Sequence, residues 1–404
     1  MAKTGILNTI RKKLTFWTAV FWILIGFGLY ATIVRFTQGL GAVTNLSDNV
    51  PWGLWVSFDV LCGVGLAAGG FTLAAVVHIF NIKSYEPVIR PAILTAFLGY
   101  LLVCVGLIFD LGKPWNIWHP LIMWNHHSVM FEVAWCVMLY TTVLALEFSP
   151  VVFEKFRLEK PLRIIKRVTI PLVILGVILS TLHQSSLGSV FLIVPEKMYP
   201  LWYSPFLPVF FFISAVMVGF AMVIFESYLS ARAFNKSLEK PLLMELARAA
   251  VFVMMLFLVL RFIDFTQRGV WGYLFRLQYE TIIFWIETSV GVIIPMILLS
   301  IPRVRKNENA LFWSVVMVVV GFVMNRLDVS IVALQASNGA AYFPSIMEIG
   351  ITLFLMAVGF GAFRYIAKNF PIFEPTTPIE TLGTQKIKVT VKPKVAFMQT
   401  AKNS

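Results

Sequence analysis

Residues 206–228 read FLPVFFFISAVMVGFAMVIFESY and carry one charged side chain, Glu226. An α-helix rises about 1.5 Å per residue, so a run of this length crosses a hydrocarbon core about 30 Å thick. Its apolar residues do not alternate with polar ones, which excludes a strand of a membrane β-barrel. This stretch therefore predicts a transmembrane α-helix.

Further apolar runs of similar length are spread along the chain. They account for a composition of 59% hydrophobic and 13% charged residues, because a soluble domain carries about a quarter charged residues. The first run follows a basic N-terminus and lacks a small-residue cleavage site, so we expect it to be retained as a helix. The sequence predicts an all-α integral membrane protein of about ten helices, near residues 15–36, 53–80, 91–112, 127–148, 168–193, 206–228, 248–265, 279–300, 310–335 and 346–367.

The order of these helices suggests an internal arrangement. The second to fifth and the sixth to ninth helices each begin on the same side of the membrane. We therefore expect two parallel four-helix bundles, 53–193 and 206–335, flanked by the first and tenth helices. The membrane domain then spans residues 15–367, between a short N-terminal segment, 1–14, and a C-terminal tail, 368–404.

Lys and Arg residues are distributed unequally between the loops. If the N-terminus is cytoplasmic, the cytoplasmic segments hold most of them, including those of the loop 155–167. The positive-inside rule then places both termini in the cytoplasm. The same loops explain the net charge of +13, and they make anionic lipid headgroups, rather than nucleic acid, the expected partner. The outer side holds Arg35, Lys113, Lys197, Arg268 and Arg276.

The positions of the cysteines and of two glycines indicate roles in helix packing rather than in cofactor binding. Cys62, Cys104 and Cys136 occur singly inside apolar runs, so neither an intrinsic iron–sulfur cluster nor a metal site is expected. Gly65 and Gly69, in CGVGLAAGG, have the G-x-x-x-G spacing of closely packed membrane helices.

Four ionisable residues are expected in the outer half of the bilayer. A charge in hydrocarbon costs at least a few kcal/mol, so such residues are functional candidates. Counting along the helices places Asp59 about 9 Å deep, Glu132 about 8 Å and His183 about 15 Å, with Asp110 at the outer end of its helix. These four residues form the candidate catalytic set, and the alternative is a purely structural hydrogen-bond network.

The chemistry of a quinone fits these four ionisable residues. Its ring stacks on aromatic side chains, and its two-electron chemistry needs groups that exchange protons, such as histidine or a desolvated carboxyl. A b-type haem is the competitor, but of five histidines only His183 is expected deep in the membrane. We expect menaquinone or ubiquinone as substrate and no intrinsic haem. Polar and aromatic neighbours that would bind the quinone are Trp52, Trp115, Asn116, His127, Ser128, Gln184 and Ser185; for the tryptophans and the outer-loop histidines the alternatives are an aromatic belt and plain solvation.

A second set of polar residues occurs in the later helices. It would form either a proton path or a structural salt-bridge network, and we expect Arg326 to be paired because an isolated guanidinium there would be costly. The set comprises Glu226, Arg261, Asp264, Glu287, Arg326 and Asp328.

Short motifs along the chain carry a family resemblance. They are PWGLWVSFDVLCGVGLAAGGF, VIRPAILTAFLGYLL, FDLGKPWN, SVMFE, LEFSPVVFE, LHQSSLGS, PLW, VIFE, LRF, FWIE and AYFP. From about residue 35 to about residue 370 the chain resembles the HybB-type membrane subunit of nickel–iron hydrogenases, within the NrfD/PsrC family of quinone-interacting membrane subunits. The resemblance implies a ten-helix, haem-free subunit of the bacterial cytoplasmic membrane. Such a subunit exchanges electrons between a quinone near the outer face and an extracytoplasmic, ferredoxin-like iron–sulfur subunit, itself joined to a hydrogenase or another catalytic subunit.

The resemblance also suggests roles for the candidate residues. Glu132 of SVMFE and His183 of LHQSSLGS would face the quinone, Asp59 would orient or reprotonate one of them, and Asp110 would lie near the rim. His126 and His127 depart from the hydrogenase pattern, which leaves a multihaem cytochrome complex or a polysulfide or nitrite reductase open as the partner. A non-catalytic anchor and a secondary transporter are the remaining alternatives.

Overall fold

The computed structural model describes residues 16–48, 50, 52–234, 237–339 and 341–373. Within these residues the structure is helical, and one isolated bridge between Ser47 and Val50 is the only β-type pairing. The prediction of an all-α fold is confirmed. The expected N-terminal segment, 1–14, and most of the expected tail lie outside the described residues.

In the described part, nine helices are long and apolar enough to cross a membrane, judged by length and composition. The expected fifth span lies in a further long helix, α7 (Glu159–Ser189), which is not among the nine. It continues as a 3₁₀-helix to Ile193. The nine are α2 (Phe16–Gln38), the composite helix Trp55–Ile79, α5 (Glu86–Asp110), α6 (Val129–Lys155), α8 (Leu207–Phe234), α9 (Lys240–Arg268), the composite helix Tyr279–Ser300, the composite helix Glu308–Gln335 and α15 (Ile346–Asn369).

Several helices extend past their apolar runs at the expected cytoplasmic ends. For example, α5 begins at Glu86 rather than near residue 91, and α6 continues to Lys155 rather than ending near residue 148. The seventh run, expected to be the shortest, is the 29-residue helix α9. A helix satisfies its own backbone hydrogen bonds in the headgroup region too, where its charged side chains reach water. Hydropathy detects only the apolar part.

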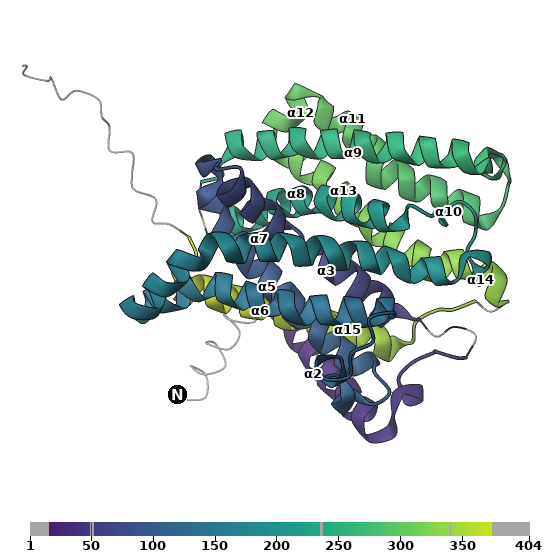
Figure 1. The fold of residues 1–404 in the computed structure, drawn as a ribbon, viewed down its shortest axis with the longest axis horizontal. Helices are drawn as coiled ribbons and strands as arrows, with labels where there is room; N and C mark the ends of the chain where they lie inside the picture. Colours follow the sequence, from purple (N-terminus) through teal and green to yellow (C-terminus); the bar gives the residue numbers. More distant parts are fainter. Residues whose placement is uncertain (1–15, 49, 51, 235–236, 340, 374–404) are drawn as a thin grey trace, which may run out of the picture. The chain divides into compact units, whose positions relative to one another are not determined.

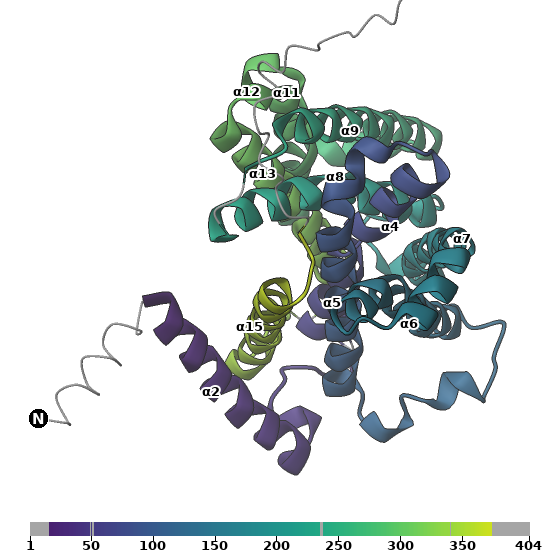
Figure 2. The same cartoon turned by 90° about the vertical axis from the view of Figure 1, so that its left-hand side faces the viewer.

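The composite helix Trp55–Ile79 and α8 are the most buried spans. The composite helix comprises η2 (Trp55–Cys62), α3 (Gly63–Leu66), α4 (Gly69–Ala74) and η3 (Ala75–Ile79), and parts of it contact α5, α7, α8 and α13. Figure 1 shows α7, α8 and α9 side by side, and α7 contacts both α6 and α8. Figure 2 shows α2 and α15 together at one edge, where α15 contacts α5.

Glycines allow the central helices to approach closely. A Cβ atom on Gly69 would lie 3.2 Å from the carbonyl oxygen of Gly219 in α8, and one on Gly65 would lie 2.1 Å from the ring of Phe322. The interpretation of this glycine motif as a packing surface is confirmed. A second crossing brings Gly321 of α13 (Glu308–Leu327) so close to Gly291 that a Cβ on Gly321 would lie 1.9 Å from the Cα of Gly291.

π-Helical turns interrupt three of the spans. They are η2 and η3 in the second span, η10 (Ser289–Ile293) and η11 (Asp328–Val332), which α14 (Ala333–Asn338) follows. Asp59 lies within η2, Asp328 opens η11, and Glu287 lies two residues before η10. Such turns are frequent at functional sites because they re-aim side chains. Here they coincide with carboxylates in the middle of apolar helices.

Candidate functional site

His183 lies in α7 and is fully buried, with an exposed fraction of 0%. Its Nδ1 lies 2.8 Å from the carbonyl oxygen of Leu179, one turn earlier, so Nδ1 carries a proton and donates it. Nε2 is then an acceptor, and the hydroxyl of Tyr100 in α5 donates to it. In its neutral form the imidazole is therefore held in one tautomer by partners on two helices.

A buried polar cluster surrounds this pair. The ring of Tyr140 in α6 packs edge-to-face on Tyr100 at 4.7 Å between centroids and tilted against His183 at 5.7 Å. Gln184 donates through Nε2 to the carbonyl oxygen of Val64, at 3.0 Å. Within the described residues, three buried atoms of this cluster make no well-formed hydrogen bond: the hydroxyls of Tyr140 and Ser180, and Oε1 of Gln184. Tyr100 nevertheless interacts with Ser180 and Gln184, and Tyr140 interacts with Ser180, so these polar groups form one buried network around His183.

Two carboxylates follow this cluster along α5 toward its C-terminal end. Asp59 packs against Gly106, two turns from Tyr100, and accepts a hydrogen bond from the hydroxyl of Thr352 in α15, at 3.1 Å. Asp110 ends α5 and interacts electrostatically with Asp59. The rise of a helix places Asp59 about 9 Å and Asp110 about 15 Å from Tyr100 along the axis. The structure therefore arranges His183, Asp59 and Asp110 in a row, rather than as one contact cluster.

A set of hydrogen bonds around Glu348, called the lock below, closes the end of this row at Asp110. The Glu348 side chain, 1% exposed, accepts from the hydroxyl of Tyr342 at 2.5 Å, the backbone N–H of Asn45 at 3.0 Å and that of Ser345 at 2.8 Å. Burial, followed by the hydrogen bond to Glu348, raises the pKa of Tyr342 in this loop, so its phenol remains a donor. Arg35 of α2 donates to the carbonyl oxygens of Phe109 and Leu111 at 2.7 and 2.8 Å, and so ties α2 to the end of α5.

Glu132 lies apart from His183. It is exposed in the first turn of α6, eight residues before Tyr140, or about 12 Å along the helix. The preceding loop exposes Trp115 and His127, while Asn116 is half-buried. Ser128 is the N-cap of α6 and accepts from the backbone N–H of Phe131 at 3.3 Å. The candidates in the loop before α6 thus form a largely exposed surface, and Ser128 starts α6.

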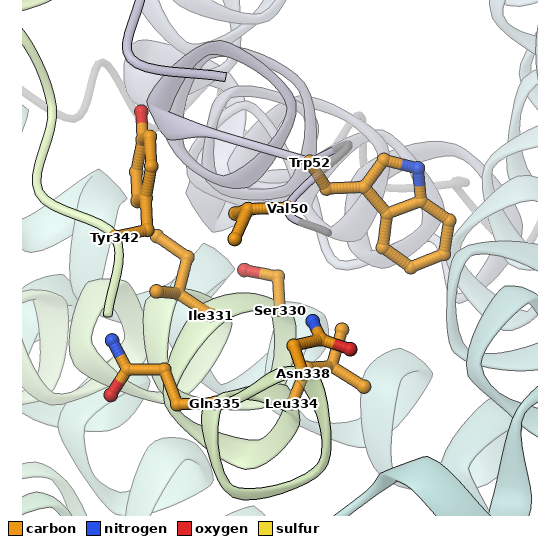
Figure 3. A pocket seen from close by; sticks show the side chains of 8 residues that line it. All are labelled: Val50, Trp52, Ser330, Ile331, Leu334, Gln335, Asn338 and Tyr342. Atoms are coloured by element: carbon orange, nitrogen blue, oxygen red, sulfur yellow. The ribbon is translucent and has the colours of Figure 1, made fainter. Parts of the chain in front are cut away.

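Trp52 lines a small pocket near the same end (Figure 3). Its ring packs edge-to-face on Phe191 at 5.4 Å, and in Figure 3 it stands opposite Tyr342, with Val50 and Ser330 between them. The cavity measures about 10 Å³, which is room for about one water molecule and far too little for a quinone ring. Ser185, half-buried in α7, accepts from Ser189 through its carbonyl oxygen at 3.3 Å. The described contacts do not join Trp52 or Ser185 to the His183 cluster.

The second set of polar residues contains one continuous network. Glu287 accepts from the indole N–H of Trp202 and from the Nδ2 of Asn325, both at 2.7 Å. Arg326 donates to Oδ1 of Asn325 at 2.7 Å and to the hydroxyl of Ser214 at 2.8 Å, and its guanidinium lies 3.7 Å from the ring centroid of Phe211. Arg326 is paired as expected, but with neutral acceptors and aromatic faces: the described residues give it no ion pair.

The other members of this set lie in three places. Arg261 and Glu287 line one cavity of about 30 Å³, room for about two water molecules, and Nη1 of Arg261 has no hydrogen-bond partner in the described residues. Asp264 instead forms an ion pair with Arg268 at 2.7 Å. Asp328, 6% exposed, interacts with Glu287. Glu226 lies on α8 and interacts with Thr95 of α5.

Sequence reasoning missed Tyr100 and Tyr140. Both sit mid-helix in runs that read as continuously apolar, and tyrosine has a hydrophobic body with one polar atom. The hydroxyl at the depth of His183 was the available sign, because a buried Tyr O–H needs a partner. Their partnership with His183 depends on helix rotation, which spacing alone does not give.

The fold and site define a polytopic integral membrane protein with a buried His–Tyr pair at its centre. The family described as "Polysulphide reductase, NrfD" matches residues 42–337, and the chain belongs to this NrfD family. It is 42% identical over 376 residues to a protein of Nitratidesulfovibrio vulgaris (strain Hildenborough) named only "Protein", covering 90% of this chain and 96% of the relative.

Two further relatives have more specific names. The chain is 34% identical over 361 residues, 88% of this chain and 92% of the relative, to the "Probable Ni/Fe-hydrogenase 2 b-type cytochrome subunit" of Escherichia coli (strain K12). It is 27% identical over 397 residues, 90% of this chain and 92% of the relative, to the "Menaquinone reductase, integral membrane subunit" of N. vulgaris Hildenborough. The sequence-based assignment to this family is confirmed.

Proposed function

We propose that this chain is the quinone-reactive membrane subunit of a respiratory oxidoreductase complex in the bacterial cytoplasmic membrane. The observation that carries the proposal is the hydrogen bond between His183 and Tyr100, which lies in a buried cluster of polar side chains. The family assignment and the names of the hydrogenase and menaquinone reductase relatives point the same way. The chain is not catalytic alone, because the electrons come from a partner subunit.

The chemistry assigns roles along the row of residues. Reduction of a quinone to a quinol takes up two electrons and two protons. The hydroxyl of Tyr100 is hydrogen-bonded to the imidazole of His183, so the pair offers a quinone both a hydroxyl and an imidazole as hydrogen-bonding groups. Asp59 and Asp110 connect this pair to the outer end of α5, and Glu132 exchanges protons at the mouth. A menaquinone or ubiquinone ring would enter from lipid at this end.

The electron-donating partner is a ferredoxin-like iron–sulfur subunit on the outer side. The loop before α6 supports a docking surface there, because its large apolar side chains are exposed: Trp115 by 69%, Ile122 by 71% and Met123 by 60%. Hydrogen oxidation by an attached hydrogenase is the proposed source of electrons. A multihaem cytochrome or a polysulfide or nitrite reductase is the second candidate for the electron-donating complex. If the chain were instead a non-catalytic anchor or a transporter, the His183 cluster would have no part in quinone chemistry.

The name of the E. coli relative contains "b-type cytochrome", and a haem would need a histidine of this chain free to bind its iron. All five histidines lie in the described residues, and His183 is the one that is fully buried. Both of its ring nitrogens are engaged, by Leu179 and Tyr100. These residues do not fit an axial haem ligand, and no step of the proposed reaction passes through a haem.

Purification of the complex in mild detergent tests this proposal. Mass spectrometry of the co-purifying subunits and quinones, with absorption spectra of the isolated chain, should show an iron–sulfur partner, bound quinone and no haem attached to this chain. A haem b that stays with this chain after removal of its partners would overturn the haem-free assignment. A chain that purifies alone and without quinone would favour the anchor or transporter.

A further inference from the structure

Arg35 is a buried cation at the Asp110 end of the row, and the roles proposed above do not use it. It lies in the last turn of α2 and is 3% exposed. Its guanidinium lies 5.5 Å from the ring centroid of Phe36, and within the described residues it forms no ion pair. A buried positive charge is costly unless other groups compensate it, so the partners of Arg35 indicate what it does.

These partners are the carbonyl oxygens on either side of Asp110. Nε of Arg35 donates to the carbonyl of Phe109 at 2.7 Å, and Nη2 donates to that of Leu111 at 2.8 Å. The carbonyls at the end of a helix lack partners within the helix and carry the negative end of its dipole. The planar guanidinium therefore caps α5 and fixes the backbone of both neighbours of Asp110.

Arg35 also acts on the Asp110 carboxyl through its charge, because the two groups interact electrostatically. Lys113, three residues farther along the chain, is exposed. The other titratable groups that face Asp110 from neighbouring elements are Asp59 in η2, Glu348 in α15 and Tyr342 in the loop before α15. In this part of the described structure, one buried guanidinium thus lies among three carboxyls.

We propose that Arg35 is a positioning residue for proton exchange at Asp110. This inference rests on the proposed function and deepens it. The two hydrogen bonds hold Asp110 at the end of the row, and the positive charge stabilises the carboxylate that remains when Asp110 passes on a proton. Two electrons and two protons still convert quinone to quinol. Arg35 itself gives up no proton, because a guanidinium stays charged in proteins.

The test measures the pH profile of quinone reduction by the complete purified complex. Reduced methyl viologen donates electrons, 2,3-dimethyl-1,4-naphthoquinone accepts them, and the rate should fall on the alkaline side, where Asp110 loses the proton that it supplies. Arg35→Gln removes the positive charge, so Asp110 should keep its proton to higher pH. We expect the alkaline fall to move upward by about one pH unit, since a nearby opposite charge favours an ionised carboxyl by about 1–3 units.

Matched variants separate the effect of the charge from that of the tether. Arg35→Lys keeps the charge but loses the fork, so the fall should stay in place while the melting temperature drops. Arg90→Gln is the control, because Arg90 lies at the other end of α5, where it donates to the carbonyl of Pro371 and pairs with Glu154, both at 3.0 Å. Its pH profile should match that of the unmodified complex.

Two further variants keep the test decisive. If Arg35→Gln does not assemble, Arg35→His takes its place, because histidine is charged during purification in mild acid and neutral on the alkaline side. Asp110→Asn should lower the rate or remove the alkaline fall. A fall that persists in Asp110→Asn and still moves when Arg35 is also replaced would show that Arg35 acts on another carboxyl, and would overturn the inference.

The remaining outcomes distinguish this inference from the proposed function. A neutral variant at position 35 that is less stable but has an unmoved pH profile would show that Arg35 only ties α2 to α5. A fall that moves as far in Arg35→Lys as in Arg35→Gln would show that the charge is not the cause. Either result would overturn the role of Arg35 and leave the quinone function standing. Absence of quinone reduction in the complete, unmodified complex would refute the proposed function itself.

Discussion

At the scale of single residues, the His183 imidazole is fixed by two hydrogen bonds of different origin. The bond to the Leu179 carbonyl is local and comes with the helix, whereas the bond from Tyr100 depends on the packing of α5 against α7. Residue type and depth therefore suffice to single out His183 from the sequence. Tyr100 and Tyr140 could not be assigned in the same way, because the rotation of each helix about its axis comes from packing.

Tyr100→Phe removes the hydroxyl that donates to Nε2 of His183. We expect assembly of the complex to persist, with a loss of about 1–3 kcal/mol in stability from the unpaired imidazole nitrogen. Quinone reduction should fall by roughly 10²-fold, measured with reduced methyl viologen and a soluble naphthoquinone, because proton transfer is impaired. Tyr228→Phe is the control, since that hydroxyl donates to Asn309 at 2.6 Å on α13. An assembled Tyr100→Phe complex with full activity would favour the anchor.

Glu348→Ala removes one acceptor from three donors at once, those of Tyr342, Asn45 and Ser345. Leaving the buried Tyr342 hydroxyl and the partly buried N–H groups of Asn45 and Ser345 without this acceptor should lower the free energy of unfolding by about 3 kcal/mol. Thermal unfolding of the purified protein in detergent measures this loss. Glu159→Ala is the control, because Glu159 is exposed in the first turn of α7. Equal melting temperatures for the two variants would contradict this account of the lock.

At the scale of elements, the hydropathy of the sequence located the helices. Each helix that spans a bilayer must by itself be long and apolar enough to do so, whatever its neighbours are. It misjudged the ends of α5, α6 and α9, which continue into the headgroup region. It could not find the π-helical turns, since these depend on packing and leave no mark in composition. The glycine motif could be predicted from the sequence, because the close approach of two helices requires small residues at a fixed spacing.

Gly321→Ala tests the tightest crossing, between α13 and the turn η10. The added methyl group would lie 1.9 Å from the Cα of Gly291, so the two backbones must move apart. We expect a loss of stability of about 3 kcal/mol or more and a much lower yield of folded protein, measured by size-exclusion chromatography in detergent. Gly26→Ala, whose new methyl group meets nothing within 4 Å, should behave normally. A well-folded Gly321→Ala protein would show that this crossing is looser than described.

At the scale of the whole molecule, orientation follows from charges that lie outside the apolar runs. The quinone proposal depends on this orientation, because it places the iron–sulfur partner on the outer side. The expected fifth span matters most here: α7 must cross for the loops before and after it to lie on opposite sides.

Single cysteines introduced at Lys160 and Lys197 test this orientation. Both residues are exposed, at opposite ends of α7. In intact cells, a maleimide that does not cross membranes should label Lys197→Cys at least about tenfold faster than Lys160→Cys, and disruption of the membrane should equalise the rates. Cys62 and Cys136 are buried and Cys104 is partly buried within α5, which keeps the background labelling low. The reverse order would invert the assignment of sides.

The π-helical turn around Asp59 has a consequence for how this sequence can change. A π turn holds one more residue than an α turn, so removing one residue from η2 could restore an ordinary helix of nearly the same length. The segments before and after the turn would then keep their relative orientation, so Val64 could keep its place beside Gln184. The turn that carries Asp59 would lose its extra residue, and the carboxyl would no longer be aimed at Thr352. The extra residue in this turn is therefore what directs Asp59 toward α15, and a single deletion there should remove that contact while it leaves the rest of the helix in register.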